Sequence, residues 1–145
     1  MTATISERII AALATQAATL DSVTAVERSR ADAYARRESG SVCIEPDSST
    51  PQEVNICRTE WIDRVLFGIY TCGPIPDQLA DPIRRDIHAM VMAYRRSING
   101  IAIINITAGT VTRELEPGDR PVMWTLCPYL IQYQTSIEDL TTQDP

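Results

Sequence analysis

Residues 53–72 constrain the fold of this chain more than any other segment, because they read as one continuous strand. An average strand spans only about five or six residues. Residues 58–64 carry four charged side chains, among them Asp63, whereas residues 65–70 are apolar on both faces. Strands that are covered on both faces are apolar throughout. We therefore predict that the end of this strand is buried under helices, and that its beginning faces solvent or a neighbouring subunit.

Two helices are expected to cover the sheet. In residues 4–20, Thr4 and Glu7 have the spacing of a capping box, and apolar residues recur at every third or fourth position. The second helix is expected to start at Asp77 as its N-cap and to carry an apolar stripe that includes Ile87. An Asn-Gly pair at residues 99–100 is the expected end of this helix.

The remaining strands are expected at residues 41–45, 101–107, 110–114 and 121–135. Pro128 lies inside the last of them, which favours an edge strand or a bulge, because proline cannot donate to a β-ladder. Two prolines bracket the small polar residues 46–51, a pattern typical of a loop. Residues 21–40 fit either a solvated connector or an interaction arm.

These elements predict an α+β fold, a small, mostly antiparallel β-sheet flanked by two main helices. Residues 1–135 are expected to form this single domain. Residues 136–145 carry three acids and no base, and we expect them to form an acidic, flexible C-terminal tail.

The charge of the chain excludes some kinds of partner. All 13 basic residues are arginines, and 19 acidic residues give a formal net charge of −6. Without a basic cluster, a dedicated nucleic-acid binder is not expected. No apolar run approaches the roughly 20 residues of a membrane span, and the first residues lack the pattern of a signal peptide. We expect a soluble protein that does not act at a membrane.

Residues that commonly serve in catalysis or metal binding are few and dispersed. The chain has one histidine and four cysteines, none of them in a CxxC pair, so we expect no metal site and four reduced, packed thiols. His88 follows Arg84 and Arg85 by one helical turn, and no carboxylate is spaced to orient its ring, so we expect a surface histidine rather than a general base. Phosphate-binding loops and nucleophile elbows are missing from the sequence. We therefore expect no catalytic residues and no cofactor.

Several motifs occur in an order that resembles a known family. Ser41-Val-Cys-Ile-Glu45 precedes Thr59-Glu-Trp61, which opens the long strand, and Pro76-Asp-Gln-Leu79 starts the second helix. Gly109-Thr-Val-Thr-Arg-Glu114 then leads through an acidic turn to the strand Trp124-Thr-Leu-Cys-Pro-Tyr-Leu-Ile-Gln-Tyr133. Over residues 4–135 this succession resembles the tail terminator proteins of long-tailed bacteriophages, the family of minor tail protein U of lambda-type phages.

The resemblance implies a structural virion protein rather than an enzyme. Such proteins form a homo-hexameric ring that caps the tail tube, stops its polymerisation and joins it to the head-side connector, or neck, protein. DNA passes through the lumen without sequence-specific binding, and an acidic lumen would repel its phosphates. The resemblance also implies assembly in the host cytoplasm. Two alternatives are a tail-completion or head–tail connector protein, and a small enzyme or ligand-binding domain with a site of scattered residues.

Two polar, proline-bearing segments, residues 45–53 and 114–120, are the expected sites of assembly contacts. Both lie at strand ends, where they contribute little to a core and are free to project toward neighbours. Basic residues flank the acidic turn of the second segment, an arrangement suited to ion pairs between subunits. We therefore expect a protein–protein interface at Asp47, Arg113, Glu114, Glu116, Asp119 and Arg120.

Overall fold

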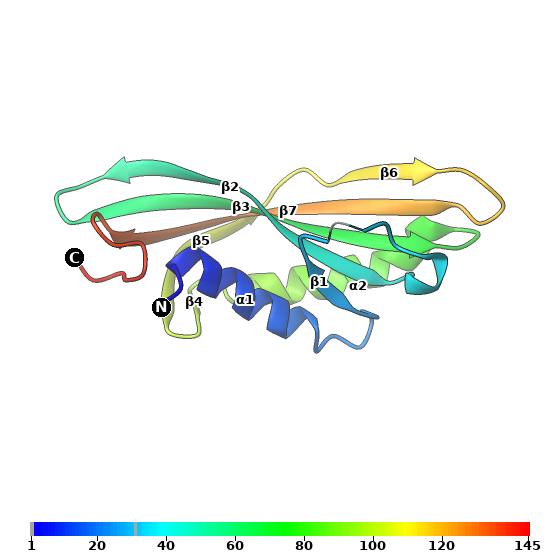
Figure 1. The fold of residues 1–145 in the computed structure, drawn as a ribbon, viewed down its shortest axis with the longest axis horizontal. Helices are drawn as coiled ribbons and strands as arrows, with labels where there is room; N and C mark the ends of the chain where they lie inside the picture. Colours follow the sequence, from blue (N-terminus) through cyan, green and yellow to red (C-terminus); the bar gives the residue numbers. More distant parts are fainter. Residues whose placement is uncertain (1, 31) are drawn as a thin grey trace.

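The computed structural model describes residues 2–30 and 32–145 and shows one large sheet with two helices packed on one side (Figure 1). The helices are α1 (Ile5–Ala17), α2 (Pro76–Met92) and the short 3-10 helix η1 (Arg36–Glu38). The strands are β1 (Val26–Arg28), β2 (Ser41–Val54), β3 (Arg58–Cys72), β4 (Ser97–Ile98), β5 (Ile101–Ala108), β6 (Thr112–Glu116) and β7 (Val122–Ser136). Their order in the sheet is β1-β2-β3-β7-β5-β4, and β6 pairs with the first part of β7.

The expected fold class, an α+β fold with a small, mostly antiparallel sheet, is wrong. Strands make up 43% of the chain and helices 23%, so the protein is mostly β. The seven strands form a curled sheet like half a barrel, and the sheet is mixed because β1 runs parallel to β2. The sheet is large because β2, β3 and β7 each span 14 or 15 residues.

The loop expected at residues 46–51 is also wrong, because β2 continues through this segment. It pairs with β3 from Ser41 to Val54, and register shifts follow both Pro46 and Pro51. Beyond Ile44, where pairing with β1 ends, β2 is an edge strand, so prolines and bulges are tolerated there. The reversal of the chain comes later, where the Asn55 side chain accepts hydrogen bonds from two following backbone N–H groups.

Pro128 lies in a central strand rather than at an edge, since β7 pairs with β3 on one side and with β5 and β6 on the other. The residue is tolerated because β5 ends and β6 begins opposite it. There the Pro128 carbonyl accepts a hydrogen bond from the Gly109 N–H at 2.9 Å. A Cβ atom at Gly109 would lie 2.9 Å from the proline ring, so the close approach of the two strands requires glycine.

Both helices follow from local sequence, with differences at the two ends of α2. Thr4 caps α1 as expected, accepting a hydrogen bond from the Glu7 N–H at 3.1 Å. In α2, Pro76 rather than Asp77 begins the helix, because the fixed φ and missing N–H of proline suit the first helical position. Asn99 and Gly100 do not end α2 as expected, because the helix ends at Met92. The pair has positive φ values and forms the tight turn between β4 and β5.

The core lies between the helices and the side of the sheet that faces them. Alternate β3 residues, among them Phe67, pack against Leu13 of α1 and Ile87 of α2 in one buried cluster. The connector between β1 and β2 packs on the side of the sheet opposite the helices, here called the outer face. Its Tyr34 stacks on Tyr70 with ring centroids 5.1 Å apart, and the edge of Trp124 completes the group.

The C-terminal segment lies against the domain. The Leu140 carbonyl accepts a hydrogen bond from the Ile5 N–H at 2.8 Å, and the Gln143 side chain bonds both backbone groups of Ala102 at 2.9 Å. The boundary at residue 135 and the flexibility of residues 136–145 stay predictions, which these contacts do not favour.

The four cysteines are free, but they are not all packed as expected. Cys43, Cys72 and Cys127 are buried, whereas Cys57 is exposed in the turn between β2 and β3. The sequence placed Cys57 inside a long strand, and the true turn falls just before Arg58.

Candidate functional site

The hairpin of β6 and β7 gathers five of the six residues predicted to form an interface. Residues 112–120 are all exposed. Within the described part of the chain, neither Arg113 nor Arg120 lies within ion-pair distance of a carboxylate. Register with β7 places Glu114 opposite Trp124 and Glu116 opposite Val122. Successive side chains of a strand alternate between faces, so Glu114 and Glu116 share the outer face and Arg113 lies on the helix side.

Asp47, the sixth predicted residue, lies apart from the other five. It belongs to the β2–β3 hairpin, where its carboxylate accepts a hydrogen bond from Arg64 at 2.5 Å. The turns of the two hairpins lie at opposite ends of the long axis of the molecule (Figure 1). Asp47 itself lies near the middle of β2, beside Arg64, and so belongs to neither turn.

Exposed apolar side chains at these two ends were not predicted from the sequence. Ile56, in the β2–β3 turn, is 93% exposed. At the other end, Leu115 and Ile75 are 55% and 50% exposed beside a shallow hollow of about 340 Å³ that Met123 also lines. Exposed apolar side chains on projecting segments are typical of contact surfaces. The lone Ile56 between polar neighbours was the only sequence signal for the first of these positions.

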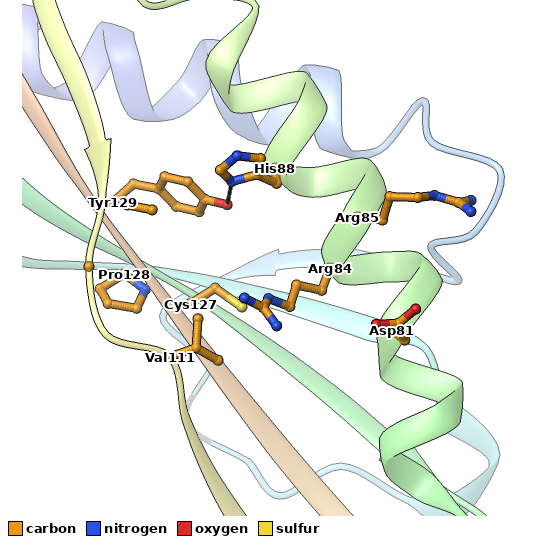
Figure 2. Close-up of a pocket in the computed structure, with 10 residues that line it drawn as sticks. Asp81, Arg84, Arg85, His88, Val111, Cys127, Pro128 and Tyr129 are labelled. Atoms are coloured by element: carbon orange, nitrogen blue, oxygen red, sulfur yellow. Dashed lines mark hydrogen bonds between the residues drawn. The ribbon is translucent and has the colours of Figure 1, made fainter.

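A second hollow of about 340 Å³ lies between α2 and the interruption that separates β5 from β6. Arg84 extends toward Cys127 in this hollow, whereas Arg85 points away from it (Figure 2). His88 accepts or donates a hydrogen bond through Nδ1 to the Tyr129 hydroxyl at 2.9 Å. The exposure of His88 agrees with the surface position that the sequence predicts.

The Tyr129 hydroxyl and the Cys127 thiol in this second hollow are protonated at neutral pH. Burial raises the pKa of Tyr129 to about 12 and also raises the pKa of the Cys127 thiol, although the nearby Arg84 and Arg113 partly oppose the latter effect. At neutral pH neither group is a thiolate or phenolate nucleophile. In residues 2–30 and 32–145, no three His, Cys, Asp or Glu side chains are grouped to hold a metal ion.

The Tyr129 pKa predicts a loss of stability at alkaline pH. An unfolded tyrosine titrates near pH 10, so between about pH 10 and 12 the unfolded state ionises first and gains free energy relative to the folded state. At pH 11 this lowers the free energy of unfolding by about 1.4 kcal/mol. Urea denaturation at pH 9 and pH 11 measures how far the free energy of unfolding falls between the two pH values. The fall should be smaller by this amount in Tyr129→Phe than in the unchanged chain. Equal falls in the two proteins would contradict the prediction.

Comparison with known proteins finds similarity among solved structures. No protein-family model matches the sequence, and no curated protein does either. Among solved structures, the chain is similar to one in the structure titled "Virion of native gene transfer agent (GTA) particle". The fold is shared with a virion chain. The TM-score is 0.55, and the match covers 86% of this chain and 87% of the virion chain at 10% sequence identity. At that identity the similarity concerns the fold and not individual residues. No helix of the described residues is both long and apolar enough to cross a membrane.

Proposed function

We propose that this chain is a structural protein of a phage-like virion. The observation that carries the proposal is the fold, which matches a chain of a gene transfer agent virion over nearly the full length of both. The hairpins support it, because both project from the sheet and expose charged or apolar side chains that a single copy leaves uncovered. In the second hollow, Cys127 and Tyr129 are protonated at neutral pH, so neither supports the alternative of a nucleophilic enzyme site there.

Within the virion, we propose the role of tail terminator. Six copies would form a ring at the head-proximal end of the tail tube, where the ring stops polymerisation and meets the head-side connector. DNA would pass through the ring without sequence-specific contacts, which suits a chain with a net charge of −6. A ring built from one kind of contact needs two different surfaces on each copy, and the two hairpins at opposite ends of the molecule meet this need.

Location and copy number test the role. An antibody against this chain should label purified particles at the junction of head and tail, and quantitative mass spectrometry should count six copies per tail. Twelve copies at the same junction would identify a neck protein instead. Label on the capsid shell, or no label on particles, would overturn the virion proposal.

Charge reversal in the β6–β7 hairpin should block assembly without unfolding the protein. Arg113→Glu and Arg120→Glu alter exposed side chains, and such changes usually alter stability by less than about 0.5 kcal/mol. Each should nevertheless give overlong tubes or tails without heads in electron micrographs. Arg36→Glu, an equally exposed reversal on η1, is the matched control and should give normal tails. Normal tails from both hairpin variants would place the interface elsewhere.

A further inference from the structure

A third hollow, of about 180 Å³, lies on the outer face of the sheet, opposite the helices. It crosses four neighbouring strands, with Glu45 on β2, Leu66 and Gly68 on β3, Trp124 and Leu126 on β7, and Glu114 on β6. Its floor is apolar, and a carboxylate from an outer strand stands at each side. We refer to it as the outer-face hollow.

Gly68 gives this hollow its shape. A Cβ atom at this position would lie 3.1 Å from the indole ring of Trp124, closer than nine in ten real contacts. Glycine therefore allows the indole to lie against β3, where Tyr34 and Tyr70 hold it in edge-on contact at 5.3 and 5.4 Å. The result is a fixed aromatic wall beside an apolar floor.

The two carboxylates have no cation of their own. Glu45 and Glu114 are both exposed, and no arginine of the described chain lies within ion-pair distance of either. Register places Glu45 opposite Leu66 and Glu114 opposite Trp124, so the apolar floor separates the two charges. Such a site favours a group that is flat, apolar on its faces and cationic, which describes a guanidinium.

The same molecule already binds one arginine in this way. The Arg30 guanidinium lies 4.0 Å from the centre of the Tyr34 ring and forms ion pairs with Glu27 at 2.8 Å and Glu38 at 2.5 Å. An aromatic ring and two carboxylates from different segments are thus sufficient to hold an arginine on this surface. The outer-face hollow beside it presents the same three groups, with Trp124 as the ring.

Arginines without partners occur on the opposite side of the molecule. Arg84, Arg95 and Arg96 are exposed on α2 and the turn after it, and within the described residues none forms an ion pair. Since α2 covers the side of the sheet away from the outer face, a contact between the two joins different surfaces of two copies (Figure 1). Contacts of this kind generate rings when the rotation between copies closes.

We propose that the outer-face hollow binds an arginine side chain from the α2 side of a second copy of this chain. The guanidinium lies against Trp124 and pairs with Glu114, while Glu45 lines the far side of the hollow, and the hollow is a subunit contact of the ring. The inference rests on the proposed function insofar as that function requires a ring of identical copies. Its chemistry, an arginine between two carboxylates and an indole, is independent of where the ring sits in a particle.

Charge reversal with rescue tests the pairing. Sedimentation velocity over a concentration series should show that Glu114→Arg weakens self-association at least about tenfold. Asp21→Arg, an exposed charge reversal in the turn after α1 and outside the hollow, α2 and both hairpins, is the matched control and should associate like the unchanged chain. Combining Glu114→Arg with Arg84→Glu, Arg95→Glu or Arg96→Glu should restore association for one of the three pairs. Circular dichroism melts check that every variant is folded.

Trp124 itself provides a second measurement that does not depend on self-association. The chain has two tryptophans, so Trp61→Phe leaves Trp124 as the only indole emitter. A synthetic peptide of residues 81–97, which contains the α2 arginines, should shift the Trp124 emission, and the same peptide with glutamine in place of arginine should not. Glu45→Gln combined with Glu114→Gln should weaken the response at least about tenfold.

The outcomes separate this inference from the proposed function. Association that is indifferent to Glu114→Arg, or no response of Trp124 to the arginine peptide, overturns the pairing even if six copies are counted at the tail. A chain that stays monomeric at every concentration overturns the assignment to a second copy, and a Trp124 response in that case assigns the hollow to an arginine of another protein. Loss of association in Glu114→Arg with normal particle labelling supports both proposals.

Discussion

Replacing Ile87 with Asp is expected to abolish folding. The Ile87 side chain lies in the centre of α2, is 0% exposed and packs in the cluster between the helices and the sheet. Truncating such a side chain alone costs about 2–5 kcal/mol, and burying an unpaired carboxylate adds several more. The sum is comparable to the roughly 5–15 kcal/mol that stabilises a typical domain. Far-UV circular dichroism and the soluble yield on expression measure the result.

Leu66→Asp is the matched control for Ile87→Asp. Alternation along β3 places Leu66 on the outer face, where it is half-buried in the floor of the outer-face hollow. A carboxylate there stays in contact with water, so we expect a cost of about 1–2 kcal/mol and a folded protein. Unfolding of both variants would show that the outer face is as deeply buried as the helix side.

The contrast between these two residues shows where sequence reasoning succeeds and where it fails. Ile87 was expected in the core because its helical stripe has polar residues on the other side, and a period near 3.6 then identifies one face. Residues 65–70 were also expected to be buried under the helices, and for Leu66 this was wrong. Residues 65–70 are apolar on both faces, so a period of two does not reveal which face the helices cover.

Errors in the sheet have the same origin. Proline and small polar residues at 46–51 indicate a loop by local preference, but pairing with β3 overrides that preference along an edge. The central place of Pro128 depends on Gly109, nineteen positions away, leaving an interruption opposite it. Neither the pairing of residues 46–51 with β3 nor the pairing of Pro128 with Gly109 can be inferred from adjacent residues in the sequence.

The candidate surfaces show the same difference between residues that are close in sequence and residues that only the fold brings together. Five predicted interface residues lie together because they are close in sequence and share one hairpin. The outer-face hollow, in contrast, combines four strands whose lining residues lie as far apart in the sequence as Glu45 and Leu126. Such a constellation is visible only once strand order and register are known.

Asp63 was read as one of several charges that mark an exposed start of the long strand, and the structure buries it. Its side chain is on the helix side of β3, only 3% exposed, beneath the first turn of α1. The Ser6 hydroxyl donates a hydrogen bond to one carboxylate oxygen and the Tyr133 hydroxyl donates to the other at 2.9 Å. The positive end of the α1 dipole further favours a carboxylate at this position.

We therefore expect Asp63→Ala to lower the free energy of unfolding by about 3 kcal/mol. The change leaves the buried Tyr133 hydroxyl and the Ser6 hydroxyl without an acceptor, and unsatisfied buried donors cost about 1–3 kcal/mol each. Asp47→Ala, which removes the exposed ion pair with Arg64, is the control and should cost less than about 1 kcal/mol. Urea denaturation compares the two variants.

Tyr133→Phe distinguishes a hydrogen-bond network from simple packing. If Asp63 serves mainly as the acceptor for Tyr133, removing the hydroxyl alone should cost about 1–2 kcal/mol. The double variant Asp63→Ala, Tyr133→Phe should then be less destabilised than the sum of the two single variants, because no orphaned hydroxyl remains at position 133. Additive effects would contradict the network. Coupling would show that a buried carboxylate attaches α1 to the middle of β3 and β7, a contact that sequence alone assigned to solvent or to a neighbouring subunit.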